Sequence, residues 1–557
     1  MSFKPTHLSH RTIPQRALEW ACTATLVTGC WQVCAQTVPD AGSLLRQTER
    51  NLSIPSAPAA PAARREIKTL SPAQPGETTV TVERFQFKGN TRLDEAQLQQ
   101  SLSAFVGRPL SFAQLEQAAD TVAEAYREAG WVVRAFLPPQ EVEQGLVTIE
   151  IVEAVFGTTT ITGEPSKRIH AERLVRIVQQ AQPEGEPLNA SHIDRALILL
   201  DDLPGVSVSG NLVEGDQDGQ TNLNLTVTDE ALLSGSVFVD NNGSRSTGPE
   251  RLSANLSFNS PAQLGDAATL NLLKTQGSEY QRAAYIVPLG YQGLRGGVHF
   301  SNLNYQLIGD FAALGAKGVA QTAGLDLSYP LVRSQTHNLQ LALSYDHKTF
   351  DNTANAGSSK YSINAYTFTL SSTQFDSGGS VTASSASVTT GEKNSEGTYS
   401  KLNLNFSRQQ ILADGLSLLV SASWQIASKN LDSSEKIYLG GASGVRAYPS
   451  NEGGGSEGRT LTTELRQRLA DRWTLSGFYD YGWALVNRSP TPSPSIPASY
   501  YLHGAGLSLT WLGSDGLDFK LTAAQRFNSN PLQSVQGMDT DGSHKLTRVW
   551  FTATKAF

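Results

Sequence analysis

The sequence of 557 residues has little cysteine, no long apolar run and few charged residues. Its three cysteines, Cys22, Cys30 and Cys34, all lie near the N-terminus, so the rest of the chain cannot form disulfide scaffolds or cysteine-ligated metal sites. Because no apolar run is long enough for a spanning helix, any membrane crossing must be made by strands. Charged residues make up 17% of the chain, below the ~25% of ordinary soluble domains. The net charge of −7 excludes nucleic-acid binding through bulk basic charge.

Catalytic and metal-binding motifs are scarce as well. Residues 454–458 match G-x-S-x-G literally, but they lie in a glycine-rich stretch without the strand-to-helix turn that a hydrolase nucleophile needs. Residues 539–542 begin like a calcium loop and lack its later ligand positions. No phosphate-cradling GxxxxGK[ST] motif occurs, so the chain is not expected to use nucleotide energy. We therefore expect no catalytic residue, no metal and no cofactor.

The N-terminus has the pattern of an export signal. Arg11 and Arg16 precede a mildly apolar stretch, and Val33–Ala35 forms a small-residue cleavage site, which predicts a signal peptide over residues 1–35. An alternative interpretation is a lipoprotein cleavage box at Val27–Cys30. Residues 36–77 then combine a short helix candidate, for which Asp40 is the expected N-cap, with a linker rich in proline and alanine.

Two segments with the same predicted order of strand, helix, helix, strand and strand follow, over residues 78–154 and 155–231. The clearest helix of the first segment has apolar residues three or four positions apart, as an amphipathic helix requires: Phe112, Leu115, Ala119, Val122 and Tyr126. We also expect one strand to contain Val80, Val82, Phe85 and Phe87. Two βααββ modules in tandem are thus predicted.

Residues 232–557 have a different residue pattern, because helical periodicity is replaced by sixteen segments in which apolar and polar residues alternate. The connections after even-numbered segments are short. Most of those after odd-numbered segments are longer, and they include residues 307–317, 351–359, 429–459, 487–499 and 528–544. An even number of strands with short turns at one end and long loops at the other is typical of a bacterial outer-membrane β-barrel.

One strand and one loop of this region carry the candidate site. Alternation places Phe478, Asp480 and Gly482 on one face of a strand, with aromatic residues on the face that suits lipid. Asp480 then points into the lumen, where a bidentate arginine is its best partner. Arg446, in the long glycine-rich loop, is our candidate. A solvated aspartate and an exposed loop arginine are the alternative.

These residues resemble the outer-membrane transporters of two-partner secretion, the haemolysin secretion/activation (TpsB) family of the POTRA-plus-barrel superfamily. The family's loop motif VRGY is present as Val445, Arg446, Ala447 and Tyr448, with alanine in place of glycine, and its strand motif FxDxG as Phe478, Asp480 and Gly482. Residues 39–47, which include Leu44, Leu45 and Arg46, resemble the family's plug helix. The resemblance implies that the loop folds back into the barrel, where Arg446 meets Asp480.

The resemblance and the residue patterns together predict a transmembrane β-barrel of sixteen antiparallel strands (232–557), two periplasmic POTRA domains (78–154 and 155–231) and an N-terminal plug helix. The implied function is secretion of a large, unfolded exoprotein that the POTRA domains bind in the periplasm. The expected partners also include outer-membrane lipid and the barrel-assembly machinery, which reads an aromatic C-terminus such as Phe557, but no nucleic acid. An insertase of the same superfamily is the main alternative, followed by a passive porin. The exoprotein could be an adhesin, a haemolysin or a contact-dependent toxin.

Overall fold

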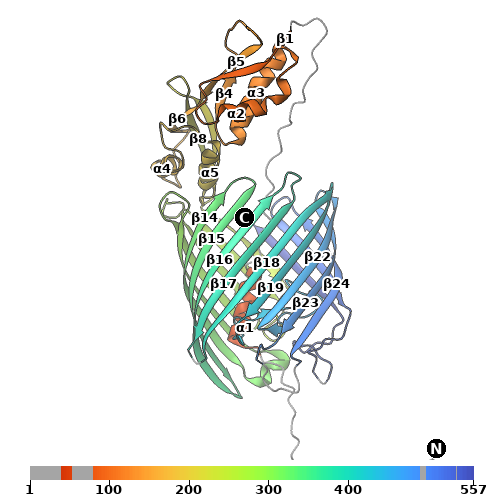
Figure 1. Cartoon of the computed structure of the whole chain (residues 1–557). Helices are drawn as coiled ribbons and strands as arrows, with labels where there is room; N and C mark the ends of the chain where they lie inside the picture. The colour runs from red at the N-terminus through yellow and green to blue at the C-terminus, as the bar shows by residue number, and fades with distance from the viewer. Residues whose placement is uncertain (1–38, 53–78, 395, 490–496, 535) are drawn as a thin grey trace, which may run out of the picture.

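The computed structural model describes residues 39–52, 79–394, 396–489, 497–534 and 536–557. Three parts follow one another along the chain: a short helix, two α/β modules and a large barrel (Figure 1). The predicted signal peptide, its lipoprotein alternative and the predicted proline- and alanine-rich linker lie outside the described residues.

Helix α1 (Ala41–Leu52) lies inside the barrel, although it precedes both modules in the sequence (Figure 1). Asp40 caps the helix as expected, because its Oδ1 accepts a hydrogen bond of 2.8 Å from the backbone N–H of Ser43. Leu44 and Leu45 are buried against apolar side chains of the barrel wall, among them Tyr280, Leu303, Phe350 and Ile363. The apolar face of the helix therefore packs against the inner wall of the barrel.

The first module contains a three-stranded sheet covered by two helices. Its sheet has the order β2-β5-β4, in which β2 and β5 are parallel. The elements are β1 (Thr79–Thr81), β2 (Arg84–Lys88), α2 (Glu95–Ser101), η1 (Ser103–Phe105), β3 (Pro109–Ser111), α3 (Phe112–Glu128), β4 (Val133–Phe136) and β5 (Leu146–Glu153).

Two expectations for this module were wrong. The single strand expected to run from Val80 to Phe87 is divided, because β1 leaves the sheet and pairs with β3 instead. Phe112 was expected on the buried face of its helix, but its side chain is 65% exposed. It is the first residue of α3, and burial begins one turn later at Leu115.

The second module repeats this arrangement, with the sheet order β6-β8-β7. Asn189 caps its second helix, since its Oδ1 accepts hydrogen bonds from the backbone of Ser191 and His192. The elements are β6 (Val155–Thr162), α4 (Ala171–Ala181), α5 (Ala190–Asp201), β7 (Val206–Glu214) and β8 (Gln220–Asp229).

Sixteen antiparallel strands close into a barrel, and this confirms the predicted fold class. The last strand pairs with the first over five residue pairs, from Thr552↔Asp240 to Ala556↔Ser236. The strands are β9 (Leu233–Asp240), β10 (Arg251–Asn259), β11 (Ala267–Lys274), β12 (Ser278–Pro288), β13 (Arg295–Gln306), β14 (Lys317–Arg333), β15 (His337–Ala354), β16 (Gly357–Phe375), β17 (Val381–Lys393), β18 (Gly397–Ala413), β19 (Leu416–Ala427), β22 (Glu457–Ala470), β23 (Trp473–Leu485), β24 (Ser499–Leu512), β25 (Leu517–Arg526) and β26 (Thr547–Ala556).

One predicted long loop is absent. The expected loop over residues 351–359 is a tight hairpin, because β15 and β16 remain paired as far as Ala354↔Gly357. These two strands have 18 and 19 residues, more than the 9–11 that a membrane crossing needs. The two strands, with side chains alternating between their two faces, therefore continue beyond the strand ends expected from the sequence.

The second module is docked on the short turns of the barrel. The guanidinium of Arg333, at the end of β14, holds the carboxylate of Asp202 through two hydrogen bonds of 2.6 and 2.7 Å. Arg295 donates to the backbone carbonyl of Asp202 at 2.6 Å, and Arg195 donates to that of Pro330 at 2.8 Å. The modules thus lie at the end of the barrel opposite the long loops (Figure 1).

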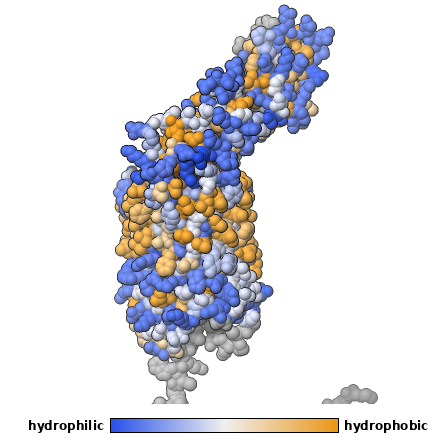
Figure 2. Space-filling view, turned by 90° about the vertical axis from the view of Figure 1, so that its left-hand side faces the viewer, coloured by the Kyte–Doolittle hydropathy of each residue, from blue (hydrophilic) through white to orange (hydrophobic). Residues whose placement is uncertain are grey.

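On the face of the barrel that Figure 2 shows, apolar side chains form a band across the outer surface. Large exposed hydrophobic residues occur on strands throughout the wall, including Leu325, Leu343, Phe368, Leu465, Leu507 and Val549. Such a band is the lipid-facing surface of a transmembrane barrel. Among the described helices, none is long and apolar enough to cross a membrane.

Candidate functional site

The long connection between β19 and β22, residues 428–456, folds back into the barrel; we call it the inward loop. A short hairpin of β20 (Ile437–Tyr438) and β21 (Gly454–Gly455) forms its neck. The backbone carbonyl of Glu452 closes the neck by accepting hydrogen bonds from Leu439 and Gly440 at 3.2 and 2.9 Å. The glycine-rich segment between these points carries Arg446 to the wall.

Arg446 contacts the strand carboxylate that the sequence indicated. Its Nε and Nη2 donate to the two oxygens of Asp480 at 2.8 and 2.9 Å, and its backbone N–H donates to Oδ2 at 3.1 Å. The residues Arg446 and Asp480 are 6% and 1% exposed. The guanidinium also lies 3.3 Å from the ring centroid of Phe478, on the same strand. This is bidentate, charge-assisted pairing in a site with little access to water.

A second carboxylate, which sequence reasoning missed, completes the site. Glu464 on β22 accepts from Nη1 of Arg446 at 2.8 Å, and its other oxygen accepts from Arg466 at 2.9 Å. Thr462 donates its hydroxyl to Asp480 at 2.9 Å. The alternating polar residues of β22 were the available signal, since Thr462, Glu464 and Arg466 share one face of that strand.

Small residues permit the close approach of the loop to the wall. A Cβ on Gly482 would lie 3.0 Å from Val445 and 3.3 Å from Leu439. Val445, Ala447 and Tyr448 are fully buried in one apolar cluster with Phe478. Ala447, which replaces the family's glycine, is not among the residues with a positive φ, so the alanine introduces no backbone strain there. The predicted residues of the loop and the strand therefore lie together.

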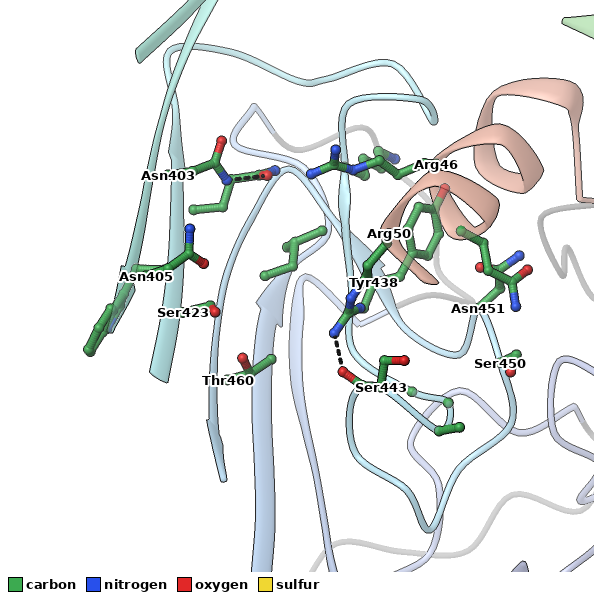
Figure 3. Close-up of a pocket in the computed structure, with 18 residues that line it drawn as sticks. Arg46, Arg50, Asn403, Asn405, Ser423, Tyr438, Ser443, Ser450, Asn451 and Thr460 are labelled. Atoms are coloured by element: carbon green, nitrogen blue, oxygen red, sulfur yellow. Dashed lines mark hydrogen bonds between the residues drawn. The ribbon is translucent and has the colours of Figure 1, made fainter. Parts of the chain in front are cut away.

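Helix α1, the predicted plug, is attached to the same loop. Arg50 donates hydrogen bonds to the backbone carbonyls of Tyr438 and Ser443, the second at 2.8 Å (Figure 3). Ser433 of the loop donates to Asp40 at the start of the helix at 2.8 Å. Arg46, the third residue that the sequence assigned to the plug, lines a cavity between α1, the inward loop and the wall (Figure 3). No sequence pattern predicts the contacts of Arg50, because its partners are backbone atoms.

These features define a class of protein: a membrane barrel with two modules at one end and with a helix and a loop held in its lumen. The family model described as "Haemolysin secretion/activation protein ShlB/FhaC/HecB" matches residues 219–510, and that of the "POTRA domain, ShlB-type" matches residues 80–154. The first match covers more than half of the chain. The chain belongs to the haemolysin secretion/activation protein family.

Individual relatives agree with this assignment. The chain is 26% identical to the heme/hemopexin transporter protein HuxB of Haemophilus influenzae (strain 86-028NP), over 94% of this chain and 96% of HuxB. It is 25% identical to the outer membrane transporter CdiB of Dickeya dadantii (strain 3937), over 69% of this chain and 72% of that protein. The solved structure of CdiB from Escherichia coli has the same fold, with a TM-score of 0.69, 23% identity and coverage of 88% of this chain and 93% of CdiB.

The chain is therefore an outer-membrane transporter of two-partner secretion, with its POTRA modules in the periplasm. This confirms the predicted family, fold class, function and location. Its named relatives are transporters.

Proposed function

We propose that this transporter moves one cognate large exoprotein, of the adhesin or haemolysin type, across the outer membrane as an unfolded chain. The observation that carries the proposal is the closed barrel whose lumen holds α1 and the inward loop, while the second module is fixed at its periplasmic end. Both occupants of the lumen are joined to the wall by non-covalent contacts, so they can move aside for a passing chain. The cargo class stays open among adhesin, haemolysin and contact-dependent toxin.

The modules supply the capture step of this proposal. Strand β2 is an edge strand of the first module's sheet, and an edge strand can add an extended segment through main-chain hydrogen bonds that tolerate varied sequence. The exposed side chains of Phe112 and Leu146 add apolar surface to the same module. Bound in this way, the exoprotein would stay unfolded next to the barrel entrance.

The remaining parts of the proposal concern export and insertion. Residues 1–35 would direct the chain to the periplasm, and residues 36–77 would tether the plug helix to the first POTRA domain over residues 78–154. The second domain would extend over 155–231 and the barrel over 232–557. The aromatic C-terminus at Phe557 is the feature that the barrel-assembly machinery would read.

Removal of the plug helix should enlarge the open pathway. We expect deletion of residues 40–52 to raise single-channel conductance in planar bilayers several-fold while secretion stays largely intact. Leu45→Asp should act in the same direction, because it places an unpaired charge where Leu45 is 1% exposed. Gln47→Asp is the matched control at a half-buried position of the same helix, and it should leave conductance unchanged. Unaltered conductance after the deletion would refute the plug assignment.

The proposed function is tested by comparing the culture medium and the outer membrane of cells with and without this chain. A transporter predicts that one very large exoprotein disappears from the medium while other outer-membrane proteins stay at their normal levels. An insertase predicts the loss of many outer-membrane proteins. A passive porin predicts that secretion persists, and either of these last two results contradicts the proposal.

A further inference from the structure

A second loop of the barrel is folded inward beside the first. The connection between β25 and β26, residues 527–546, is called the last loop here. Its aspartates, in the motif that begins like a calcium loop, contact arginines of the two flanking strands instead. Arg526 of β25 lies 2.7 Å from an oxygen of Asp539, and Arg548 of β26 contacts Asp539 and Asp541, each at 3.1 Å. These side chains are less than a tenth exposed. The last loop is thus fixed to both of its strands.

The last loop also holds a carboxylate of the inward loop. Glu452 accepts hydrogen bonds from the side-chain amide of Asn530 at 2.9 Å, from the backbone N–H of Thr540 at 3.1 Å and from its hydroxyl at 2.7 Å. Glu452 is 0% exposed. Within the described ranges, no Lys, Arg or His forms an ion pair with Glu452. A buried carboxylate needs such donors, and here all three belong to the last loop.

Two further contacts join the same parts of the molecule. The hydroxyl of Tyr448, in the VRAY motif, donates to Asn528 of the last loop at 2.8 Å. Trp550 of β26 donates its indole N–H to the backbone carbonyl of Arg446 at 2.8 Å. The last loop therefore contacts the neck of the inward loop through Glu452 and its tip through Tyr448, and β26 contacts the backbone of Arg446.

We propose that the last loop is a second anchor for the inward loop and that Glu452 is the positioning residue of this anchor. The proposal deepens the proposed function, on which it rests, because it concerns what must be released before the inward loop can leave the lumen. Arg446 attaches the tip of the loop to β22 and β23. Glu452 attaches its neck to the last loop, which Arg526 and Arg548 fix to β25 and β26. β26 is the strand that closes the barrel against β9.

The two anchors have different chemistry. Arg446 is held by opposite charges on the wall, whereas Glu452 is held by neutral donors of a neighbouring loop. The carbonyl of Glu452 also closes the neck. A change at its side chain should therefore loosen the whole segment between residues 440 and 451, while the Arg446–Asp480 pair remains chemically intact.

The test measures how accessible the inward loop is. In the full chain with its three natural cysteines replaced by serine, Ala442→Cys places a reporter thiol in the loop, and its labelling rate with a maleimide is measured in purified, folded protein. We expect Glu452→Ala to raise this rate at least about tenfold, because it removes all three hydrogen bonds that hold the neck to the last loop. Asn530→Ala combined with Thr540→Ala should raise it as well. The triple variant should exceed Glu452→Ala little in this rate, because the bonds of Asn530 and Thr540 to the inward loop are the ones that Glu452→Ala already removes. The other bonds of Asn530, to Asp539 and Leu532, lie within the last loop.

Glu457→Ala is the matched control. Glu457 lies five positions further along the chain and pairs with Arg488, whose side chain is half exposed, and not with the last loop. The reporter thiol in the Glu457→Ala variant should be labelled at the same rate as in the parent. A Glu452→Ala rate equal to the control overturns the second anchor. Should Glu452→Ala not form a heat-modifiable barrel, Glu452→Gln carries the same test, since its single oxygen cannot accept from all three donors. Labelling needs no exoprotein, so a failed secretion assay contradicts the proposed function and leaves this result standing.

Discussion

Arg446→Ala is expected to lower secretion of the exoprotein at least about tenfold while the barrel still inserts, because breaking a buried ion pair from one side costs ~3–5 kcal/mol. The substitution leaves Asp480 and Glu464 buried, 1% and 5% exposed, with Arg466 as the remaining contact of Glu464. The loop then loses its attachment to β22 and β23 and samples other positions. The sixteen-stranded ladder does not depend on this contact, so function should be lost before folding.

Asp480→Ala should have a similar effect, since it removes the bidentate partner and leaves the guanidinium with Glu464 alone. Arg488→Ala is the matched control, because Arg488 is also paired with a glutamate but its side chain is half exposed; exposed pairs are worth roughly 0–1 kcal/mol. Secretion is quantified from the medium, and insertion from heat-modifiable migration. Exchange of the two charges should restore only part of the activity, because bidentate geometry needs the guanidinium in its present place.

A double-mutant cycle distinguishes a functional contact between Arg446 and Asp480 from two independent defects. If Arg446 and Asp480 act through their contact, the double alanine variant should secrete about as well as the worse single variant. Defects that simply add in free energy would show that the two residues are not coupled, and the loop-to-wall contact would then have no role in secretion.

Deletion of residues 78–154 is expected to abolish secretion without preventing barrel assembly. The first module has its own core, formed by residues such as Phe85, Leu98, Val122 and Ile149. The barrel contacts described above are made by the second module, through Arg333 and Asp202. Removal of the first module therefore takes away the capture surface and leaves the docking contact in place. The readouts are exoprotein in the medium and heat-modifiable barrel in the membrane.

The deletion is paired with a milder change. Phe112→Ser removes the most exposed large apolar side chain of the first module. Because that side chain is 65% exposed, the substitution disturbs little buried packing. It should weaken secretion only if this surface contacts the exoprotein. Secretion by the chain that lacks residues 78–154 would contradict the capture role whatever the point variant does.

The barrel was predictable from the sequence because each strand carries its own signal. Alternation along residues 478–483 depends only on which side faces lipid, so Asp480 and Tyr479 could be assigned to opposite faces without knowledge of the partners. Where alternation continues past the membrane, as in β15 and β16, the same signal could not show that the strands stay paired to Ala354↔Gly357. The division of the first module's opening strand likewise depends on β3, which is only three residues long.

The contacts of the candidate site could be predicted only where both residues of a pair belong to known family motifs. Arg446 and Asp480 could be paired because the loop and strand motifs of one family join them. Glu464, Arg50 and Glu452 could not be found in this way. Arg50 binds backbone carbonyls, and the donors to Glu452 lie 78 and 88 positions along the chain. The contacts of Arg50 and Glu452 arise from the packing of distant segments in one lumen, and no local pattern of residues encodes them.

If the transporter needs no further component, this chain alone should move an unfolded partner across a membrane, and reconstitution can show whether it does. Purified transporter is placed in proteoliposomes, and the exoprotein that disappears from the medium of cells without this chain is added, unfolded, on the module side without nucleotide. We expect the exoprotein to become protected from external protease, and Arg446→Ala vesicles to protect at least about tenfold less of it. Equal digestion of the exoprotein with wild-type transporter and with empty vesicles would show that this chain does not transport it alone.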